Sequence, residues 1–350
     1  MVVVAVALLL TACAQAPHSS VPPSGSSSPA VAATFTACLV ADAGGFSDQG
    51  INQLSLQGLT QAAKDLGIAE QHKASTSPTD YPANFNAFVV AGCDLIIGVG
   101  AGMADAVSQA ASSSPDVEFA IVGASPSGLP VNVKPLTFSN QASFMAGYVA
   151  AALSTTAKVA TYGAQQTADV TVHMDAFAQG VSYFDKQYGA SVKLLGWNST
   201  SQTGTFISSD TPFSDIDASL ATANALVKSG ADVLFAVAGL AGEGALQAAQ
   251  NSKGKVKAIW YGTDGCAGAQ SAYCAVMPTS VDLAADVAVY QLVSDAASNK
   301  FSSVPYVGTL ANQGVSLAPW GQWADKLGEE FTSGIDDITG MITSGAITVM

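Results

Sequence analysis

Short apolar segments alternate with longer amphipathic segments along most of the chain. Residues 36–41, 94–99 and 118–122 are mainly apolar and predict buried strands. Residues 52–66 place apolar side chains at the spacing of one helix face, which predicts an amphipathic helix. Strands that are apolar along their whole length are typical of parallel sheets covered on both faces, so the pattern predicts an α/β fold. Further strands are expected at residues 158–162, 192–195, 233–237 and 258–261, and further helices at 103–111, 141–153, 172–188, 218–229 and 244–250.

One pattern occurs twice and indicates two similar lobes. In residues 91–100 a glycine precedes Asp94, which opens an apolar strand that ends in a glycine loop. Residues 229–239 repeat this order around Asp232 and end at Gly239. Open α/β sheets bind ligands at the carboxyl ends of their strands, so we expect a ligand site at these glycine loops. The repeat therefore predicts two doubly wound, parallel-sheet lobes.

The composition agrees with two lobes and excludes several partners. The 350 residues are 49% hydrophobic, and a domain usually holds roughly 100–200 residues. Acidic residues outnumber basic ones by 26 to 12, which gives a net charge of −14. Binding to nucleic acid or to anionic lipid needs a basic surface, so neither is expected. No run of about 18 apolar residues is present, so a membrane-spanning helix is not expected either.

The N-terminal residues have the features of a bacterial lipoprotein signal. The apolar run of residues 2–10 has the length of a signal peptide rather than of a membrane span. It leads to Leu10-Thr11-Ala12-Cys13, which resembles a lipobox, so residues 1–13 are predicted to be a signal peptide with Cys13 as the lipidated residue. Residues 14–33, rich in Pro, Ser and Ala, are expected to form a flexible tether. The expected location is the extracytoplasmic face of a bacterial cell membrane, with the lipid as the only anchor. The alternative is that Cys13 is an ordinary buried cysteine.

Export would allow the other four cysteines to form disulfides. Four cysteines permit three connectivities, and spacing alone does not choose among them. We favour Cys266–Cys274, which closes a short loop, and Cys38–Cys93, which joins two expected strands of one lobe. Four buried free thiols are the alternative. Since no Cys-x-x-Cys occurs, neither a zinc site nor thioredoxin-like chemistry is expected.

The segment of residues 42–52 contains the most candidate binding groups. It joins the first strand to the first helix, so its polar side chains should lie at the edge of a crevice. We expect Asp42, at the end of the strand, to contact a ligand, because an ionised carboxylate accepts hydrogen bonds from hydroxyl and NH groups. Asn52 can both donate and accept. Asp48 either contacts the ligand or caps the helix that follows.

Aromatic side chains in polar loops are the second group of candidates. Phe46 lies in the first glycine loop, and Phe213 lies in a Ser-, Thr- and Asp-rich loop. Either could offer a flat face to a base or a sugar, or could instead anchor its loop onto its own lobe. Asp264, in the turn of residues 262–265, repeats the combination of aspartate and glycine.

Motifs for catalysis and for cofactors are not found. The sequence contains no Gly-x-Gly-x-x-Gly, Walker or Gly-x-Ser-x-Gly pattern at a suitable position. Its histidines are His18, His72 and His173, which are too few for a metal cluster or a triad; His72 and His173 are expected to be polar surface residues. We therefore expect no enzyme activity, no cofactor and no metal.

Several of these segments, in their order and spacing, resemble the basic membrane protein (BMP) family of lipoproteins, which includes purine nucleoside receptors. The resemblance covers nearly all of residues 34–319. It is carried by Asp42-Ala43-Gly44-Gly45 through Asn52, by residues 138–148 and 238–245, by Gly262-Thr263-Asp264, and by residues 308–315.

The resemblance implies a type I periplasmic-binding-protein fold, with a ligand between two hinged lobes and delivery to an ABC permease. The first lobe would comprise residues 34–137 plus about 263–310, and the second 138–262 plus about 311–350. Asp42 and Asp264 match carboxylates expected on ribose hydroxyls or on nearby polar atoms. Asn52 lies in the opening motif, Phe213 resembles a base-stacking aromatic, and Gly239 lies in the matching glycine loop. A nucleoside, most simply a purine nucleoside, is the implied ligand.

Two positions depart from the family pattern. Ile51 stands where a stacking Phe is common, and Gly123 stands where an Asp is common, so Phe46 would have to supply the missing aromatic face. The ligand is then a nucleoside with an altered base preference or another small hydroxyl-rich solute. A ligand sensor of the same fold and an exported nucleoside hydrolase are the alternative functions. The net charge and the aspartates favour neutral or cationic ligands over phosphorylated ones.

Overall fold

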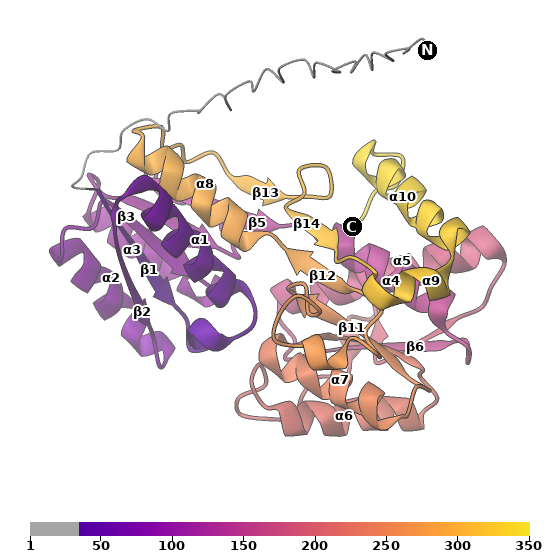
Figure 1. Cartoon of the computed structure of the whole chain (residues 1–350). Coiled ribbons are helices and arrows are strands. Elements are labelled where there is room, and N and C mark those ends of the chain that lie inside the picture. Colours follow the sequence, from indigo (N-terminus) through magenta and orange to yellow (C-terminus); the bar gives the residue numbers. More distant parts are fainter. Residues whose placement is uncertain (1–34) are drawn as a thin grey trace, which may run out of the picture. The chain divides into compact units, whose positions relative to one another are not determined.

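The computed structural model describes residues 35–350 and places two parallel-type sheets in them (Figure 1). The expected signal peptide, the tether and Cys13 lie outside the described residues. None of the helices within residues 35–350 combines the length and the apolar character that crossing a bilayer requires. The two sheets confirm the expected α/β architecture with two lobes.

The first sheet has six parallel strands in the order β13-β5-β4-β3-β1-β2. The central strands are buried, whereas β2, with the sequence Ala-Glu-Gln-His-Lys-Ala, lies at the edge and is largely exposed. Its polar sequence explains why no strand was predicted there. The strands are β1 (Thr36–Ala41), β2 (Ala69–Ala74), β3 (Leu95–Val99), β4 (Glu118–Val122), β5 (Val133–Phe138) and β13 (Tyr306–Gly308). The helices are α1 (Ile51–Leu66), α2 (Tyr81–Val90), α3 (Ala104–Ser113) and α8 (Ala285–Ala297).

The second sheet has the order β14-β12-β11-β10-β6-β7, and only β14 runs antiparallel to its neighbour. A separate two-stranded ribbon, β8 (Trp197–Asn198) and β9 (Thr203–Gly204), follows β7. The strands are β6 (Lys158–Gly163), β7 (Lys193–Leu195), β10 (Val233–Val237), β11 (Lys257–Gly262), β12 (Ser280–Leu283) and β14 (Val315–Leu317). The helices are α4 (Gln141–Leu153), α5 (Ala168–Tyr188), α6 (Ile216–Lys228), α7 (Glu243–Asn251), α9 (Ala324–Leu327) and α10 (Glu329–Thr343).

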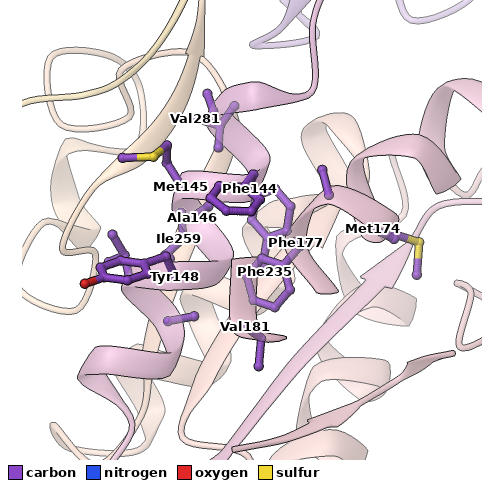
Figure 2. Packing of buried hydrophobic residues seen from close by; sticks show 14 of the residues in the cluster. Phe144, Met145, Ala146, Tyr148, Met174, Phe177, Val181, Phe235, Ile259 and Val281 are labelled. Atoms are coloured by element: carbon purple, nitrogen blue, oxygen red, sulfur yellow. The ribbon is translucent and has the colours of Figure 1, made fainter. Parts of the chain in front are cut away.

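Helices α4 and α5 pack backbone to backbone on one face of the second sheet. A Cβ at Gly147 would overlap the carbonyl oxygen of Phe177, and one at Gly180 would overlap that of Phe144, so only glycine permits this approach. Phe177 stacks on Phe235 of β10 with ring centroids 5.0 Å apart (Figure 2). The two glycines therefore bring the helices together around an aromatic core.

The chain passes between the sheets after β5, after β12 and after β13. The first lobe was expected to resume near residue 263. In the structure β12 still belongs to the second sheet, where it pairs with β11 and β14. The return to the first lobe begins at α8, which packs closely on α1; a Cβ at Gly58 would overlap the carbonyl oxygen of Asp286.

Both favoured cysteine pairs are joined in the structure. Cys38 and Cys93 form a buried disulfide within the first lobe. Cys266 and Cys274 close a short loop after β11, and both are partly exposed. The second disulfide therefore lies in the loop that carries Asp264.

Candidate ligand-binding site

One buried amide connects the two aspartates of the first glycine loop. Asn52 is 2% exposed, and its Nδ2 donates hydrogen bonds to Asp42 Oδ1 at 2.8 Å and to Asp48 Oδ2 at 3.0 Å. The loop leaves β1 at Asp42, and α1 begins at Ile51, so the bonds join the end of the strand to the start of the helix. The structure thus brings together three of the predicted site residues.

Asp48 has the capping role that the sequence allowed as one of two alternatives. Its Oδ1 accepts from the backbone amides of Gly50 and Gln53 at 3.0 Å, and its Oδ2 accepts from the backbone amide of Asn52 at 3.1 Å. Burial raises the pKa of this carboxyl, although the hydrogen bonds oppose the rise. With both oxygens occupied, Asp48 shapes the loop and has little capacity left for a ligand.

Asp42 keeps one oxygen available. Its Oδ1 accepts from Gly44 N at 2.9 Å and from Asn52, whereas Oδ2 has no hydrogen-bond donor among residues 35–350. Oδ2 lies against Gly100, in the loop after β3: a Cβ there would be 2.5 Å from it, and the φ of Gly100 is +109°. Asp42 therefore presents an acceptor at the carboxyl end of β1, where the expected site lies.

Phe46 takes the anchoring role. Its ring meets His72 of β2 edge to face, with centroids 5.1 Å apart, and it packs on the core of the first lobe. The two positions that depart from the family pattern lie next to each other, because a Cβ at Gly123 would be 3.5 Å from Ile51 Cδ1. This corner of the loop is therefore apolar and has no carboxylate.

In the second lobe, Phe213 and Gly239 are neighbours. The amide of Ala241 donates to the carbonyl of Phe213 at 2.9 Å, and a Cβ at Gly239 would be 3.6 Å from Phe213 Cδ1. Phe213 is 39% exposed, which is high for an aromatic side chain. The aromatic face is therefore accessible beside the glycine loop that follows β10.

Asp264 opens the loop after β11. Its Oδ1 accepts from the amides of Cys266 and Ala267 at 3.0 and 3.1 Å. Two residues earlier, Gly262 approaches the first lobe: a Cβ there would be 3.8 Å from Gly50 Cα. The loops that carry Asp42 and Asp264 are thus close neighbours across the two lobes.

Gly100, in the expected glycine loop of residues 91–100, allows the approach of Asp42. Two other residues of this region were not singled out by the sequence. Tyr81, the first residue of α2, is 6% exposed, and its pKa is raised by burial and by the charges of Asp42 and Asp80. Asp282 lies on β12, opposite Gly262 in the sheet register. Neither Tyr81 nor Asp282 follows a motif, because both are brought to the site by tertiary packing.

Basic side chains are absent from the loops that follow the parallel strands. All twelve basic residues of the sequence other than histidine are Lys. No Lys, Arg or His occurs in residues 42–50, 75–80, 100–103, 123–132, 164–167, 196–215, 238–242 or 263–279. The surroundings of Asp42 and Asp264 are therefore rich in acceptors and suit hydroxyl or amine donors better than phosphate.

The expectation that His173 is a surface residue is wrong. It is 6% exposed, and its ring nitrogens lie 2.9 Å from Ser143 Oγ and 2.8 Å from Tyr261 Oη. Burial lowers its pKa to about 4, against a smaller opposing effect of Asp169. Within residues 35–350, no group of three or more His, Cys, Asp or Glu side chains is arranged to hold a metal ion.

Comparisons with known proteins agree with this arrangement. A family model described as "ABC transporter substrate-binding protein PnrA-like" matches residues 35–310. The chain is 30% identical over 234 residues to a "CD4+ T-cell-stimulating antigen" of Listeria innocua, which covers 65% of this chain and 61% of that protein. It is 29% identical over 232 residues to the "ABC transporter nucleoside-binding protein BmpA" of Lactococcus lactis, covering 64% and 62%. The chain thus spans about three fifths of the length of these relatives.

A solved structure shows the same fold. An ABC transporter solute-binding protein from Aeropyrum pernix K1 matches with a TM-score of 0.77 at 19% identity, over 90% of this chain and 92% of that one. This likeness confirms the type I periplasmic-binding-protein fold.

Proposed function

Because the chain belongs to the Bmp family of ABC transporter substrate-binding proteins, we propose that it binds a nucleoside between its two lobes and delivers it to the permease of an ABC importer. The family consists of substrate-binding proteins, in agreement with the expectation that this chain is not an enzyme. Lipidation at Cys13, on the extracytoplasmic face of a bacterial membrane, is part of the proposal.

The available oxygen of Asp42 is the observation that carries the nucleoside assignment. Its Oδ2 has no donor among the described residues, and its orientation is held by the bond from Asn52. Ribose presents adjacent hydroxyl donors that such an oxygen can accept. Phe213 supports the assignment, because an accessible ring beside a glycine loop can stack on a base. The Lactococcus lactis relative, which is named as a nucleoside-binding protein, is a third, more distant support.

The test is a binding screen followed by one substitution. Calorimetry and thermal shift with adenosine, inosine, cytidine, galactose and several amino acids should give a nucleoside as the tightest ligand. A micromolar ligand at millimolar concentration should stabilise the protein by about 4 kcal/mol. Asp42→Ala should abolish that binding without unfolding the first lobe. Asp116→Ala, which removes an exposed carboxylate from a turn between α3 and β4, is the matched control and should bind normally. Tight binding of another class only, or an unchanged Kd in Asp42→Ala, would contradict the proposal.

A further inference from the structure

We propose that Asp282 selects ligands by charge in the binding site, admitting neutral or cationic solutes and excluding those that bring a phosphate or carboxylate beside it. The inference rests on the proposed function for the existence of that site. It names a residue that neither the sequence motifs nor the family resemblance indicated.

The first argument is position. Asp282 is the third of the four residues of β12, and in the sheet register it stands opposite Gly262 of β11 and Ser316 of β14. Gly262 of the second sheet approaches the first glycine loop, since a Cβ there would be 3.8 Å from Gly50 Cα. Asp282 therefore lies one strand away from the place where the two lobes' loops meet.

The second argument is the absence of a structural partner. Buried aspartates with a structural role are surrounded by donors in this protein. Asp232 accepts from Ser154 Oγ, from Thr155 N and Oγ1, and from Thr156 N, so that its pKa stays below the usual value although burial opposes this. Within residues 35–350, Asp282 receives no side-chain donor, and only the backbone amides of Asp264 and Leu283 favour its charged form.

The third argument is the charge around Asp282. Its partners in the sheet, Gly262 and Ser316, are uncharged, and the charged groups that act on it are Asp264 and Asp286. Burial and these two carboxylates raise its pKa to about 6, so it is mostly ionised at pH 7.5. Residues 262–286 contain no Lys, Arg or His to neutralise it. An anionic ligand group would be repelled here, whereas a hydroxyl or ammonium group could donate a hydrogen bond to the carboxylate.

The experiment compares ligand pairs that differ by one phosphate. Calorimetry at pH 7.5 would measure Kd for adenosine and AMP, and for galactose and galactose 6-phosphate, with the wild-type protein, Asp282→Asn and Asp286→Asn. Asp286→Asn is the matched control, since it removes a neighbouring charge on the first turn of α8. We expect the wild type to bind the unphosphorylated member of each pair more tightly. The ratio of the two Kd values should fall about tenfold in Asp282→Asn and should change less than about threefold in Asp286→Asn.

A pH series gives a second readout that a purely structural role would not produce. Hydrogen-bond donors on the ligand favour the ionised form of Asp282. Wild-type affinity for the unphosphorylated ligand should therefore rise from pH 5 to pH 7.5 with a midpoint near 6. In Asp282→Asn the affinity should depend much less on pH over this range.

The outcomes separate this inference from the proposed function. Adenosine binding with an unchanged phosphate preference and pH profile in Asp282→Asn would overturn the role of Asp282 and leave the proposed function intact. Binding of galactose instead of adenosine, with a narrowed preference in Asp282→Asn, would overturn the nucleoside assignment and support Asp282. A wild-type protein that binds the phosphorylated member of a pair as tightly as the unphosphorylated one would overturn the role of Asp282, whichever ligand the screen selects.

Discussion

Asn52 holds Asp42 in place by a hydrogen bond of 2.8 Å from its buried side-chain amide. The same Nδ2 donates to Asp48, so one amide lies between two carboxylates that would otherwise repel each other. The other oxygen of Asp48 accepts hydrogen bonds from backbone amides at the start of α1. Of the two carboxylates, only Asp42 therefore keeps an oxygen for a ligand. Asn52 is thus the residue that makes the arrangement of the loop possible.

Replacing Asn52 by Ala should weaken ligand binding by at least about tenfold, because Asp42 loses its positioning donor and faces Asp48 directly. Unfolding in urea should show a loss of about 1–3 kcal/mol. Asn84→Ala is the matched control: Asn84 is also buried in the first lobe, where it donates to Ser75 Oγ at 2.9 Å. It should lose similar stability and keep its affinity. Equal affinities for the two variants would show that Asn52 has only a structural role.

Gly100 offers a test of the position of Asp42 from the opposite side. A Cβ at this residue would lie 2.5 Å from Asp42 Oδ2, so Gly100→Ala should displace the carboxylate and reduce ligand affinity about tenfold or more. The φ of +109° adds backbone strain of about 1–2 kcal/mol.

Gly92→Ala separates these two effects. Gly92 also has a positive φ, +79°, but a Cβ there would meet nothing within 4 Å. Calorimetry and urea unfolding of both variants should therefore show strain in each and loss of binding in Gly100→Ala only. If Gly92→Ala weakens binding equally, general destabilisation is the cause.

The buried strands are the part of the fold that could be predicted from the sequence. The expected strand at 118–122 agrees with β4, because a strand covered on both faces must be apolar along its length. The same reasoning could not find β2, whose edge position leaves its polar side chains in solvent. The lobe boundary near residue 263, which the family resemblance implied, differs from the observed sheet order, because strand order is set by pairing partners that are far away in the chain.

The candidate site could be predicted only to the level of loops. The position of Asp42 after β1 follows from the apolar strand that precedes it. Which oxygen of Asp42 stays available depends on Asn52, ten residues away, and on the glycine loop after β3. The burial of His173 was missed for the same reason, because its partners Ser143 and Tyr261 are 30 and 88 positions distant.

Glu118 should make the protein less stable as the pH rises. Burial, with a contribution from Asp94, raises its pKa to about 7 from the usual 4.5, and its Oε2 has no hydrogen-bond partner among the described residues. A carboxyl whose pKa is raised in the folded state favours folding when protonated, and this contribution is lost between pH 4.5 and about 7. Because the side chain is partly exposed, solvent screening reduces the effect, and Glu118→Gln should be more stable than wild type at pH 8 by about 1–2 kcal/mol, with no gain at pH 4.5. Urea unfolding at both values measures this, with the exposed Glu330→Gln as the control. A gain of equal size at both values would contradict the titration argument.

His173 should produce the opposite dependence. Its pKa is lowered from 6.5 to about 4 by burial, so the unfolded chain binds a proton more readily than the folded one between these values. The stability contributed by the neutral imidazole is fully present above pH 6.5 and is lost as the pH falls toward 4, a change of about 3 kcal/mol. His173→Gln removes the titrating group, so the difference in unfolding free energy between pH 7 and pH 4 should be about 3 kcal/mol smaller than in wild type. His72→Gln, which replaces a partly exposed histidine, should leave that difference unchanged. Both variants keep the remaining titratable groups, so the comparison isolates His173. If the unfolding free energy of His173→Gln depended on pH as in wild type, the prediction would be wrong. The imidazole would then be protonated in the folded protein near its ordinary pKa, with Ser143 and Tyr261 as hydrogen-bond partners of the charged ring.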